Sequence, residues 1–234
     1  TKETGGTIEV LLLNQLEDAW DWKVFCKPAK KIKLGQTLFF GDHLKASVIA
    51  AKEEGVRYLR FTSDQKTFLE AIDLYGQMPL PPYIQRKEQE LSDKDDYQTV
   101  FAKEPGAAAA PTAGLHFTPE LLDSLGKQGV EKAFVTLHVG AGTFRPVQAE
   151  DITDHIMHEE SYFLDQDNAR ILNNVKSRRV CVGTTSLRTI ESIAKQKEAL
   201  LAGGGSSDLF ISPGYEFAYT DALLTNFHLP SSTL

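Results

Sequence analysis

A change of sequence pattern between residues 63 and 100 constrains the fold of this 234-residue chain more than any other feature. Before it, short apolar segments follow one another between turn residues; after it, strand-like and helix-like segments alternate. Two such patterns in one chain are typical of two domains with different layer arrangements. We therefore expect a small β-barrel domain over residues 1–62, a connector over residues 63–96, and an α/β domain over residues 97–234.

The first region is predicted to form five strands separated by glycine, proline or aspartate turns. In one of them Leu44, Ala46, Val48 and Ala50 recur at every second position, which is typical of a strand with one buried face. Five short strands at this spacing predict a small barrel. The expected strands are residues 8–13, 20–27, 36–40, 44–51 and 56–61.

The connector combines one short amphipathic helix, expected around Thr67–Leu74, with a proline-rich stretch and an acidic one, Glu88–Asp96. Proline restricts the backbone and removes a hydrogen-bond donor, so the middle of this segment is predicted to be neither helix nor strand.

The last region begins its first clear helix at Thr118, a good N-cap, with Pro119 at the first helical position. Strands alternate with helices after it, which predicts a layered α/β domain with a largely parallel sheet. The expected strands are 133–139, 179–182 and 208–211, and the expected helices are 166–175 and 186–196.

The composition excludes several classes of protein. Apolar residues make up 41% of the chain, but no run is long enough for a membrane span or a signal peptide, so we expect a cytoplasmic protein without membrane contact. The two cysteines, Cys26 and Cys181, can build neither a disulfide framework nor a four-cysteine zinc site. Because the chain lacks an initial Met and ends without a polar tail, we expect a piece of a longer polypeptide.

The net charge of -7 argues against a protein that binds nucleic acid through its overall charge. Residues 1–62, however, contain ten bases and eight acids, and four lysines lie within residues 27–33. This segment is either a solvated loop or a surface that contacts phosphate groups. Its lysines are Lys27, Lys30, Lys31 and Lys33.

Five segments with histidine, glycine, threonine or arginine fall near the expected ends of strands. In α/β sheets, ligands bind at the carboxyl ends of strands, where loops lead into helices. The candidate segments are residues 111–117, 138–146, 157–160, 182–188 and 225–230.

The second segment contains Gly140 and Gly142, but Arg145 stands where a dinucleotide fingerprint needs its third glycine, and no helix follows. What remains is a turn whose backbone can approach a ligand, with Arg145 able to bind a carboxylate or phosphate. The alternative is a structural turn with Arg145 paired to a surface acid.

The fourth segment, Gly183-Thr184-Thr185-Ser186, leads from a strand into a helix. Free N–H groups and the helix dipole make such a start a possible anion site, and an ordinary N-cap is the alternative.

The histidines and acids of the other segments suggest acid–base chemistry. His155, His158 and Glu159 do not follow a metalloprotease pattern, so we expect no metal site. Glu159 and Glu160 beside His158 suit acid–base work or a cationic substrate, or else form a solvated acidic edge. Three further histidines beside turns raise the odds that one lines a site. They are His116, His138 and His228.

Seven collinear segments resemble the S-adenosylmethionine:tRNA ribosyltransferase-isomerase family of queuosine biosynthesis (the QueA family). They are GGTIEVLL at 5–12, PGAAAAPTAGLHF at 105–117, HVGAGTFRPV at 138–147, MHE at 157–159, GTTSLRT at 183–189 with Glu191, PGYEF at 213–217 and TNFHLPSSTL at 225–234. The resemblance implies an α/β domain interrupted by a small β-barrel. It also implies transfer of the ribosyl part of S-adenosylmethionine, a co-substrate, to 7-aminomethyl-7-deazaguanine at the tRNA wobble position. The implied products are epoxyqueuosine in tRNA, adenine and methionine, and no prosthetic group is expected.

Under this resemblance we assign roles by side-chain type as hypotheses. His116 and His138 are the candidate base and acid, with His158 beside Glu159, which would face the sulfonium or an ammonium. Arg145 or Arg188, with the helix start at Gly183, would hold a carboxylate or phosphate. Asn226 and His228 would read a base edge, and the four lysines would contact tRNA. Further expected substrate-binding residues are Thr112, Gly114, Gly140, Gly142, Thr143, Thr184 and Thr185.

Two other functions compete with this interpretation. A non-catalytic tRNA-binding module would need the basic barrel but no concentration of histidine, glutamate and arginine at strand ends. A metal-dependent hydrolase would reveal itself in a metal analysis. We also expect a monomer.

Overall fold

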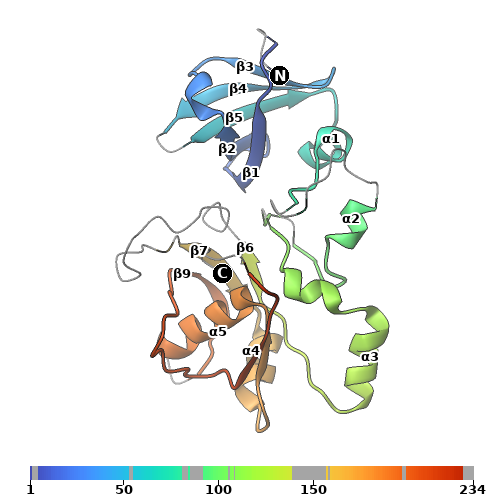
Figure 1. Ribbon diagram of the computed structural model, residues 1–234, viewed down its shortest axis with the longest axis vertical. Coiled ribbons are helices and arrows are strands. Elements are labelled where there is room, and N and C mark those ends of the chain that lie inside the picture. The colour runs from blue at the N-terminus through green and yellow to red at the C-terminus, as the bar shows by residue number, and fades with distance from the viewer. Residues whose placement is uncertain are drawn as a thin grey trace. The chain divides into compact units, whose positions relative to one another are not determined.

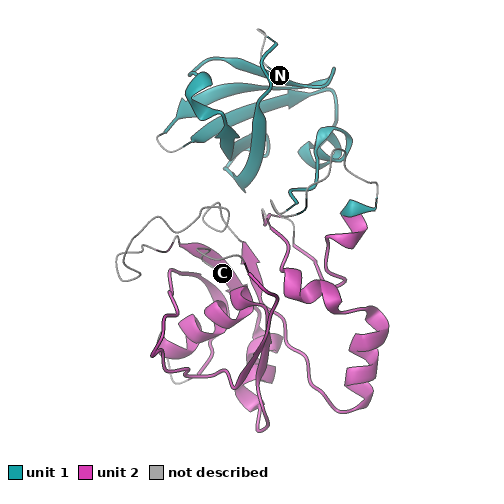
Figure 2. Cartoon of the chain, viewed as in Figure 1, with its two compact units in different colours: residues 1–93 teal, residues 94–234 magenta. Residues whose placement is uncertain are grey.

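A computed structural model describes residues 1, 5–52, 55–80, 84, 92–104, 106–107, 109–138, 157, 159–196 and 199–228. The chain divides into two compact units, residues 1–93 and residues 94–234 (Figure 2). Most elements of the two units are labelled in Figure 1.

Unit 1 is built on one antiparallel sheet in the strand order β1-β2-β5-β4-β3. All five expected strands are present, with ends that differ by at most two residues. The strands are β1 (Glu9–Gln15), β2 (Asp21–Lys27), β3 (Thr37–Phe40), β4 (Leu44–Ala51) and β5 (Val56–Ser63), with a short 3-10 helix, η1 (Ala29–Lys31), after β2.

This sheet does not close into a barrel within the described residues, so the expected barrel is not confirmed. β1 and β3 form its two edges and do not pair with each other in the part of the chain that is described. Backbone hydrogen bonds do join Thr1 to Phe39 of β3 in both directions, at 2.5 and 2.8 Å. The length and spacing of apolar segments predict the strands themselves. Closure of the sheet into a barrel depends on strand tilt and shear, which the spacing of residues does not indicate.

The core of unit 1 lies on one face of this sheet and is completed by α1 (Phe68–Tyr75). Leu44, Ala46 and Val48 are buried there, as their alternation predicts. Phe68 stacks on Trp22, with ring centroids 4.9 Å apart. The helix starts at a capping box between Thr67 and Glu70, which satisfies two backbone N–H groups. The connector expected over residues 63–96 therefore contributes this helix to the core of unit 1; the boundaries at residues 62 and 97 stay a prediction.

Unit 2 contains a three-stranded antiparallel sheet and a separate two-stranded parallel pair. The antiparallel order is β6-β7-β9, and the parallel pair joins β8 to β10. The strands are β6 (Thr136–His138), β7 (Glu160–Leu164), β8 (Val180–Val182), β9 (Gly203–Ser207) and β10 (Ala222–Leu224).

Two helices of unit 2 begin at side-chain N-caps. Thr118 caps α3 (Pro119–Lys127), as expected, and Asp165 caps α4 (Gln166–Asn174). The remaining helices are α2 (Asp93–Asp96), which starts at the unit boundary, η2 (Thr112–His116) and α5 (Thr184–Gln196). Leu164, Ile190 and Ile193 anchor a core between β7 and α5. No helix in the described ranges has the length and apolar character needed to cross a membrane.

The expectation of a largely parallel sheet is wrong for the described residues, where only β8 and β10 run parallel. The prediction of a strand at residues 208–211 is also wrong, because the strand in this region is β9, at Gly203–Ser207. The sequence does not indicate β9, because its Gly203-Gly204-Gly205 run has low strand propensity. Glycine is needed at 205 because a Cβ there would lie 2.5 Å from the Tyr162 hydroxyl oxygen of β7.

Replacing Phe68 by alanine tests whether α1 completes the core of unit 1. Phe68 is 5% exposed, so Phe68→Ala should lower the free energy of unfolding by about 3–5 kcal/mol through lost burial and a cavity. Urea denaturation followed by tryptophan fluorescence measures this unit, because both tryptophans of the chain, Trp20 and Trp22, belong to it. Leu69→Ala is the matched control, because Leu69 is 57% exposed. Equal losses in the two variants would contradict the packing described.

Candidate functional site

The carboxyl ends of the parallel pair form the first part of the candidate site. β8 ends at Val182 and β10 at Leu224, which are partners in the register, and the Gly183 N–H donates to the Leu224 carbonyl at 2.9 Å. The ends of parallel strands are where ligands bind in α/β sheets. The segment η2 reaches the same place, because a Cβ built at Gly183 would lie 3.9 Å from the Cβ of Ala113.

His116 and Asn226 meet at this end of the sheet. The His116 Nε2 atom lies 2.9 Å from the Asn226 Oδ1 atom, although the residues are 110 positions apart in sequence. Both were expected in the site, but nothing in the sequence indicates that they touch. With the amide oxygen as acceptor, Nε2 carries the proton and Nδ1 is the basic nitrogen of the ring.

The helix α5 starts at Thr184, directly after Gly183, two residues earlier than expected. Gly183 has a φ of 89°, a backbone conformation that favours glycine, and its carbonyl accepts from the Leu187 N–H. The first N–H groups of α5, including those of Thr184 and Thr185, are thus at the carboxyl end of β8. Such a helix start can bind an anion.

Two of the expected substrate-binding residues in η2, Thr112 and Gly114, lie beside this helix start by way of Ala113. Gly114 has a packing reason for being glycine: a Cβ there would lie 2.7 Å from the Phe101 ring and 2.9 Å from the Thr99 methyl group. The close approach of residues 99–101 to η2 therefore depends on this glycine.

Arg188 forms a buried ion pair and does not offer a free guanidinium fork. Its Nη1 atom donates to Glu160 at 2.9 Å, and its Nε atom donates to the Leu209 carbonyl at 3.0 Å. The two side chains are only 12% and 4% exposed. The Nη2 atom is buried and has no hydrogen-bond partner within the described residues. Arg188 thus ties α5 to the start of β7.

His138 and Glu159 lie at one end of the antiparallel sheet. His138 ends β6 opposite Ser161, and Glu159 directly precedes β7. Glu159 is exposed and accepts a hydrogen bond from the Ser206 hydroxyl of β9. Gly106 lies against the histidine ring, since a Cβ there would be 2.9 Å from its Nδ1 atom.

The helix α5 links the two ends just described. It contacts β8 of the parallel pair and also β6 and β9 of the antiparallel sheet. One helix of unit 2 therefore packs against a strand of each sheet.

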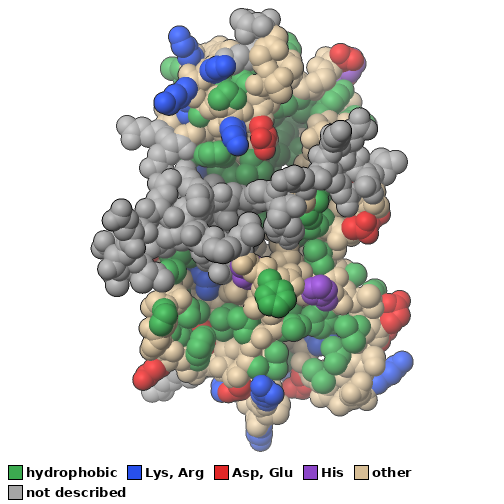
Figure 3. Space-filling model, viewed as in Figure 1, with side chains coloured by type: hydrophobic (Ala, Val, Ile, Leu, Met, Phe, Trp, Pro, Cys, Tyr) green, Lys and Arg blue, Asp and Glu red, His purple; other side chains and the backbone are tan. Residues whose placement is uncertain are grey.

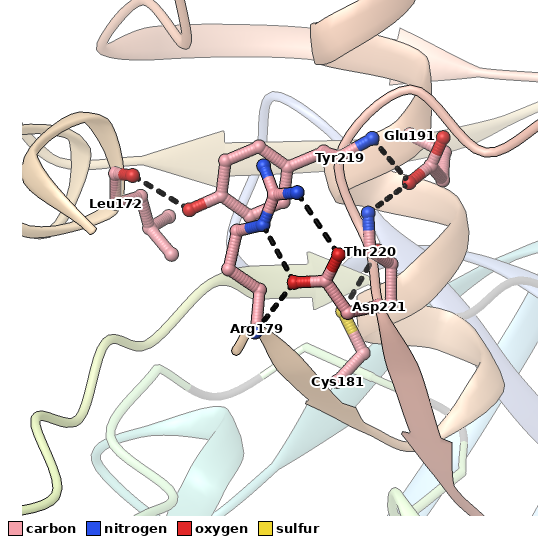
Figure 4. Close-up of polar contacts among 7 residues, drawn as sticks. All are labelled: Leu172, Arg179, Cys181, Glu191, Tyr219, Thr220 and Asp221. Carbon is pink, nitrogen blue, oxygen red and sulfur yellow. Dashed lines mark hydrogen bonds and ion pairs between the residues drawn. The ribbon is translucent and has the colours of Figure 1, made fainter. Parts of the chain in front are cut away.

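A buried carboxylate holds the loop that leads into β10. Glu191 of α5 is 0% exposed and accepts the backbone N–H groups of Ala218, Tyr219 and Thr220 at 2.7, 3.1 and 2.8 Å. Figure 4 shows the bonds from Tyr219 and Thr220. Burial acts to raise the pKa of Glu191, but these N–H groups outweigh it and hold the pKa below its usual value. The carboxylate is thus charged at neutral pH and keeps this loop on α5.

An arginine–aspartate pair closes the amino end of the parallel strands. Arg179 donates to Asp221 through Nε at 2.9 Å and Nη2 at 3.0 Å, and its backbone N–H donates to the same carboxylate at 2.8 Å. These hydrogen bonds from Arg179 lower the pKa of Asp221 to about 2. The guanidinium lies over the Tyr219 ring, 4.6 Å from its centroid, as Figure 4 also shows.

The lysine segment after β2 belongs to unit 1. Lys27, Lys30, Lys31 and Lys33 are exposed, while Ile32 between them is buried in the core of that unit. The segment therefore presents its charges outward from a fixed apolar anchor.

Several expected site residues cannot be described structurally. Gly140, Gly142, Thr143, Arg145 and His158 lie outside the described residues. His228 is half-buried and follows Asn226 after β10. In the described ranges, no three histidine, cysteine, aspartate or glutamate side chains are grouped as metal ligands.

The buried charges are what sequence reasoning missed. Glu191 and Arg188 lie three residues apart on α5, but their partners come from distant segments, at residues 218–220 and at Glu160. Both residues stand in a segment that resembles the family, but nothing in the local sequence names the partner of either charge.

Two comparisons with known proteins cover the whole chain or nearly all of it. A family model described as queuosine biosynthesis protein matches residues 1–234. A crystal structure of S-adenosylmethionine tRNA ribosyltransferase from Thermotoga maritima is 34% identical in sequence, with a TM-score of 0.41. That match covers 99% of this chain and 63% of that chain, so this chain spans less than two thirds of the length of that protein.

Replacing Glu191 by glutamine tests its hold on the loop before β10. Glu191→Gln should lower the free energy of unfolding of unit 2 at pH 7 by about 1.5–3 kcal/mol, because a charged acceptor of three N–H groups is lost. Since the pKa is lowered on folding, the carboxylate stabilises the fold above its unfolded pKa of about 4.3 and stops doing so as the pH falls through the folded value. The difference from wild type should therefore be constant from about pH 6 to 8 and shrink in acid.

Urea denaturation followed by far-UV circular dichroism at several pH values measures this difference. The control is Glu216→Gln, at an exposed residue of the same loop region, which should unfold like wild type. A difference that persists unchanged in acid would contradict the charged state assigned to Glu191.

Proposed function

This chain belongs to the family of queuosine biosynthesis proteins, and on that premise we propose that it acts as an S-adenosylmethionine:tRNA ribosyltransferase-isomerase. In the proposed reaction, the ribosyl part of S-adenosylmethionine moves to the aminomethyl group of 7-aminomethyl-7-deazaguanine at the tRNA wobble position. The products are epoxyqueuosine in tRNA, adenine and methionine. The observation that carries the proposal is the family match over residues 1–234.

The reaction sets four chemical requirements. A base removes the acidic proton next to the sulfonium, and an acid protonates the departing adenine. An anchor holds the carboxylate of the methionine part, and a carboxylate faces the positive charge. Unit 2 offers a group of the right type for each requirement.

We assign the base to His116. Its hydrogen bond to Asn226 fixes the ring orientation and leaves Nδ1 as the proton acceptor. A third group that orients the catalytic histidine is a common arrangement in acid–base sites. Asn226 then positions His116, which is a different role from reading a base edge.

The acid and the cation partner come from the antiparallel sheet in this assignment. His138 at the end of β6 donates the proton to adenine, and the exposed Glu159 faces the sulfonium or the substrate ammonium. His158 stays a candidate proton carrier beside Glu159, and His228 a candidate contact to the base.

The methionine carboxylate is assigned to the start of α5. Its free N–H groups and the hydroxyls of Thr184 and Thr185 are suited to an anion. Arg188 is better suited to holding Glu160, with which it already forms a buried pair. Thr112 of η2 lies next to this helix start, and the glycine turn with Gly140, Gly142, Thr143 and Arg145 stays a proposed substrate contact.

The tRNA is assigned to the lysine segment of unit 1. Four exposed lysines can neutralise phosphate groups without reading sequence. An enzyme with these substrates is expected in the cytoplasm, and we propose that it acts as a monomer, with no prosthetic group.

The reaction itself is tested by supplying both substrates to the protein. Incubation with S-adenosylmethionine and tRNA that carries the aminomethyl-deazaguanine should release adenine and methionine in equal amounts, measured by liquid chromatography. The control uses the same tRNA with guanine at the wobble position, which lacks the accepting amine and should release neither. Absence of both products from a folded sample would overturn the proposed function.

The roles of the histidines are tested by single substitutions followed by adenine release. His116→Ala and His138→Ala should each lower kcat by about 10²–10⁴, which is the usual contribution of a general base or acid. His43→Ala is the control, because His43 is an exposed residue of unit 1 paired with Asp64 at 3.0 Å. Glu159→Ala should also slow turnover.

Adding Asn226→Ala to His116→Ala separates a positioning role from an independent one. If Asn226 acts only through His116, the double variant is no slower than His116→Ala alone. Additive losses would show that Asn226 has a role of its own, and near-normal turnover in all three single variants, at His116, His138 and Glu159, would refute the assignment.

A further inference from the structure

A buried arginine whose guanidinium donates to backbone carbonyls lies beneath the lysine segment. Arg57 of β5 is 8% exposed. Within the described residues, it forms no ion pair with an aspartate or glutamate. Burying a guanidinium is costly unless its N–H groups find acceptors. Here the acceptors are backbone carbonyl oxygens.

The guanidinium of Arg57 joins two loops of unit 1. Toward the lysine segment, Nη2 donates to the Ala29 carbonyl at 2.7 Å and Nε donates to the Ile32 carbonyl at 3.2 Å. Toward the hairpin between β4 and β5, Nη1 donates to the carbonyls of Lys52 and Val56 at 2.9 and 2.8 Å. Arg57 therefore links the lysine segment to the end of β4 and the start of β5.

The segment is anchored at two kinds of contact, and its lysines lie between them. The Ile32 side chain is 3% exposed in the core of unit 1, and the carbonyls at 29 and 32 are bound by Arg57. Lys30 lies between these carbonyls, and Lys33 follows them. The lysine positions are thus set by bonds to the backbone, which do not depend on the lysine side chains.

The charged side chains within the lysine segment are all positive. Residues 27–33 contain four lysines and no acid, and Arg57 adds a further positive charge behind them. Like charges held close together repel, so the ordered segment is maintained against its own charge. Figure 3 shows lysine and arginine side chains exposed on one face of unit 1.

We propose that Arg57 is a positioning residue which makes residues 27–33 a preformed binding surface for the phosphate backbone of RNA. The proposal rests on the proposed function, in which tRNA is a substrate. A preformed surface loses less conformational entropy on binding than a loop that must order first. Arg57 itself is buried and does not touch the RNA.

The side chains of the segment favour backbone contact over base readout. Its cations are all lysines, which act as mobile point charges toward phosphates. Contacts to phosphates position a nucleic acid and carry no sequence information. The surface is therefore expected to bind tRNA whatever base occupies the wobble position.

Arg57→Met tests the proposal, since it removes every guanidinium donor and keeps the apolar stem. Arg57→Lys keeps the charge but cannot reach carbonyls on both sides as a planar fork does. Lys30→Met/Lys33→Met removes two surface charges directly. The control is Lys45→Met, which removes an exposed cation of β4 away from the segment.

Binding of unmodified tRNA is measured by fluorescence anisotropy at several salt concentrations, so that no chemistry is needed. Removing Lys30 and Lys33 should make the slope of log K against log salt less steep by about 1–2, as expected for two lost phosphate contacts. Arg57→Met should weaken binding at least about tenfold and flatten the slope by a similar amount, although a buried residue is changed. Arg57→Lys should fall between Arg57→Met and wild type, and Lys45→Met should bind like wild type.

Limited trypsin digestion distinguishes a local release of the lysine segment from a general loss of stability of unit 1. Release of the segment should speed cleavage after Lys30, Lys31 and Lys33 in both Arg57 variants, compared with cleavage elsewhere in unit 1. A general loss of stability would instead speed cleavage throughout the unit. Wild-type tRNA affinity and salt slope in Arg57→Met, or cleavage that rises equally at all sites, would overturn the proposal.

The outcomes also separate this proposal from the proposed function. Salt-dependent tRNA binding that is lost in the Arg57 variants supports the surface even if no adenine is released by wild type. Adenine release that stays normal, with unchanged KM for tRNA in Arg57→Met, would refute the surface and leave the enzymatic proposal standing.

Discussion

Parallel pairing of β8 with β10 brings together two segments that the chain separates widely, and the first half of the candidate site depends on it. Arg179 and Asp221, 42 residues apart, close one end of this pair. At the other end the Gly183 N–H binds the Leu224 carbonyl, so α5 and Asn226 start from the same edge. The His116–Asn226 contact, at 2.9 Å, forms two residues beyond the end of β10. A strand pair shifted by one residue would turn each side chain to the opposite face.

Buried charges hold the irregular segments of both units in place. Glu191 binds three backbone N–H groups, whereas Arg57 binds four backbone carbonyls. In each case one charged side chain satisfies polar backbone groups that a loop would otherwise leave to water. Loops held in this way can carry functional side chains with little motion, which suits a site built from segments far apart in sequence.

The net charge of the whole chain disfavours RNA binding, whereas the local charge of the lysine segment favours it. An overall charge of -7 disfavours polyanions, yet unit 1 presents four lysines in seven residues. Electrostatic potential near a surface depends mainly on charges within about 8 Å at physiological salt, since more distant exposed charges are screened. A local lysine segment can therefore bind RNA on an acidic protein. Acids elsewhere in the chain then limit nonspecific binding.

The sequence by itself determined the five strands of unit 1 and the helices that begin at Thr118 and around Thr67, and it predicted candidate site residues. These features depend on spacing, propensity and caps, which are properties of neighbouring residues. It did not determine closure of the sheet, the antiparallel order of β6, β7 and β9, or the glycine-rich strand at 203–207. It also could not assign Arg188 to Glu160, or Arg57 to the carbonyls of Ala29 and Ile32. These contacts join residues that are distant in sequence, and only the packing of the folded chain decides which buried charge finds which partner.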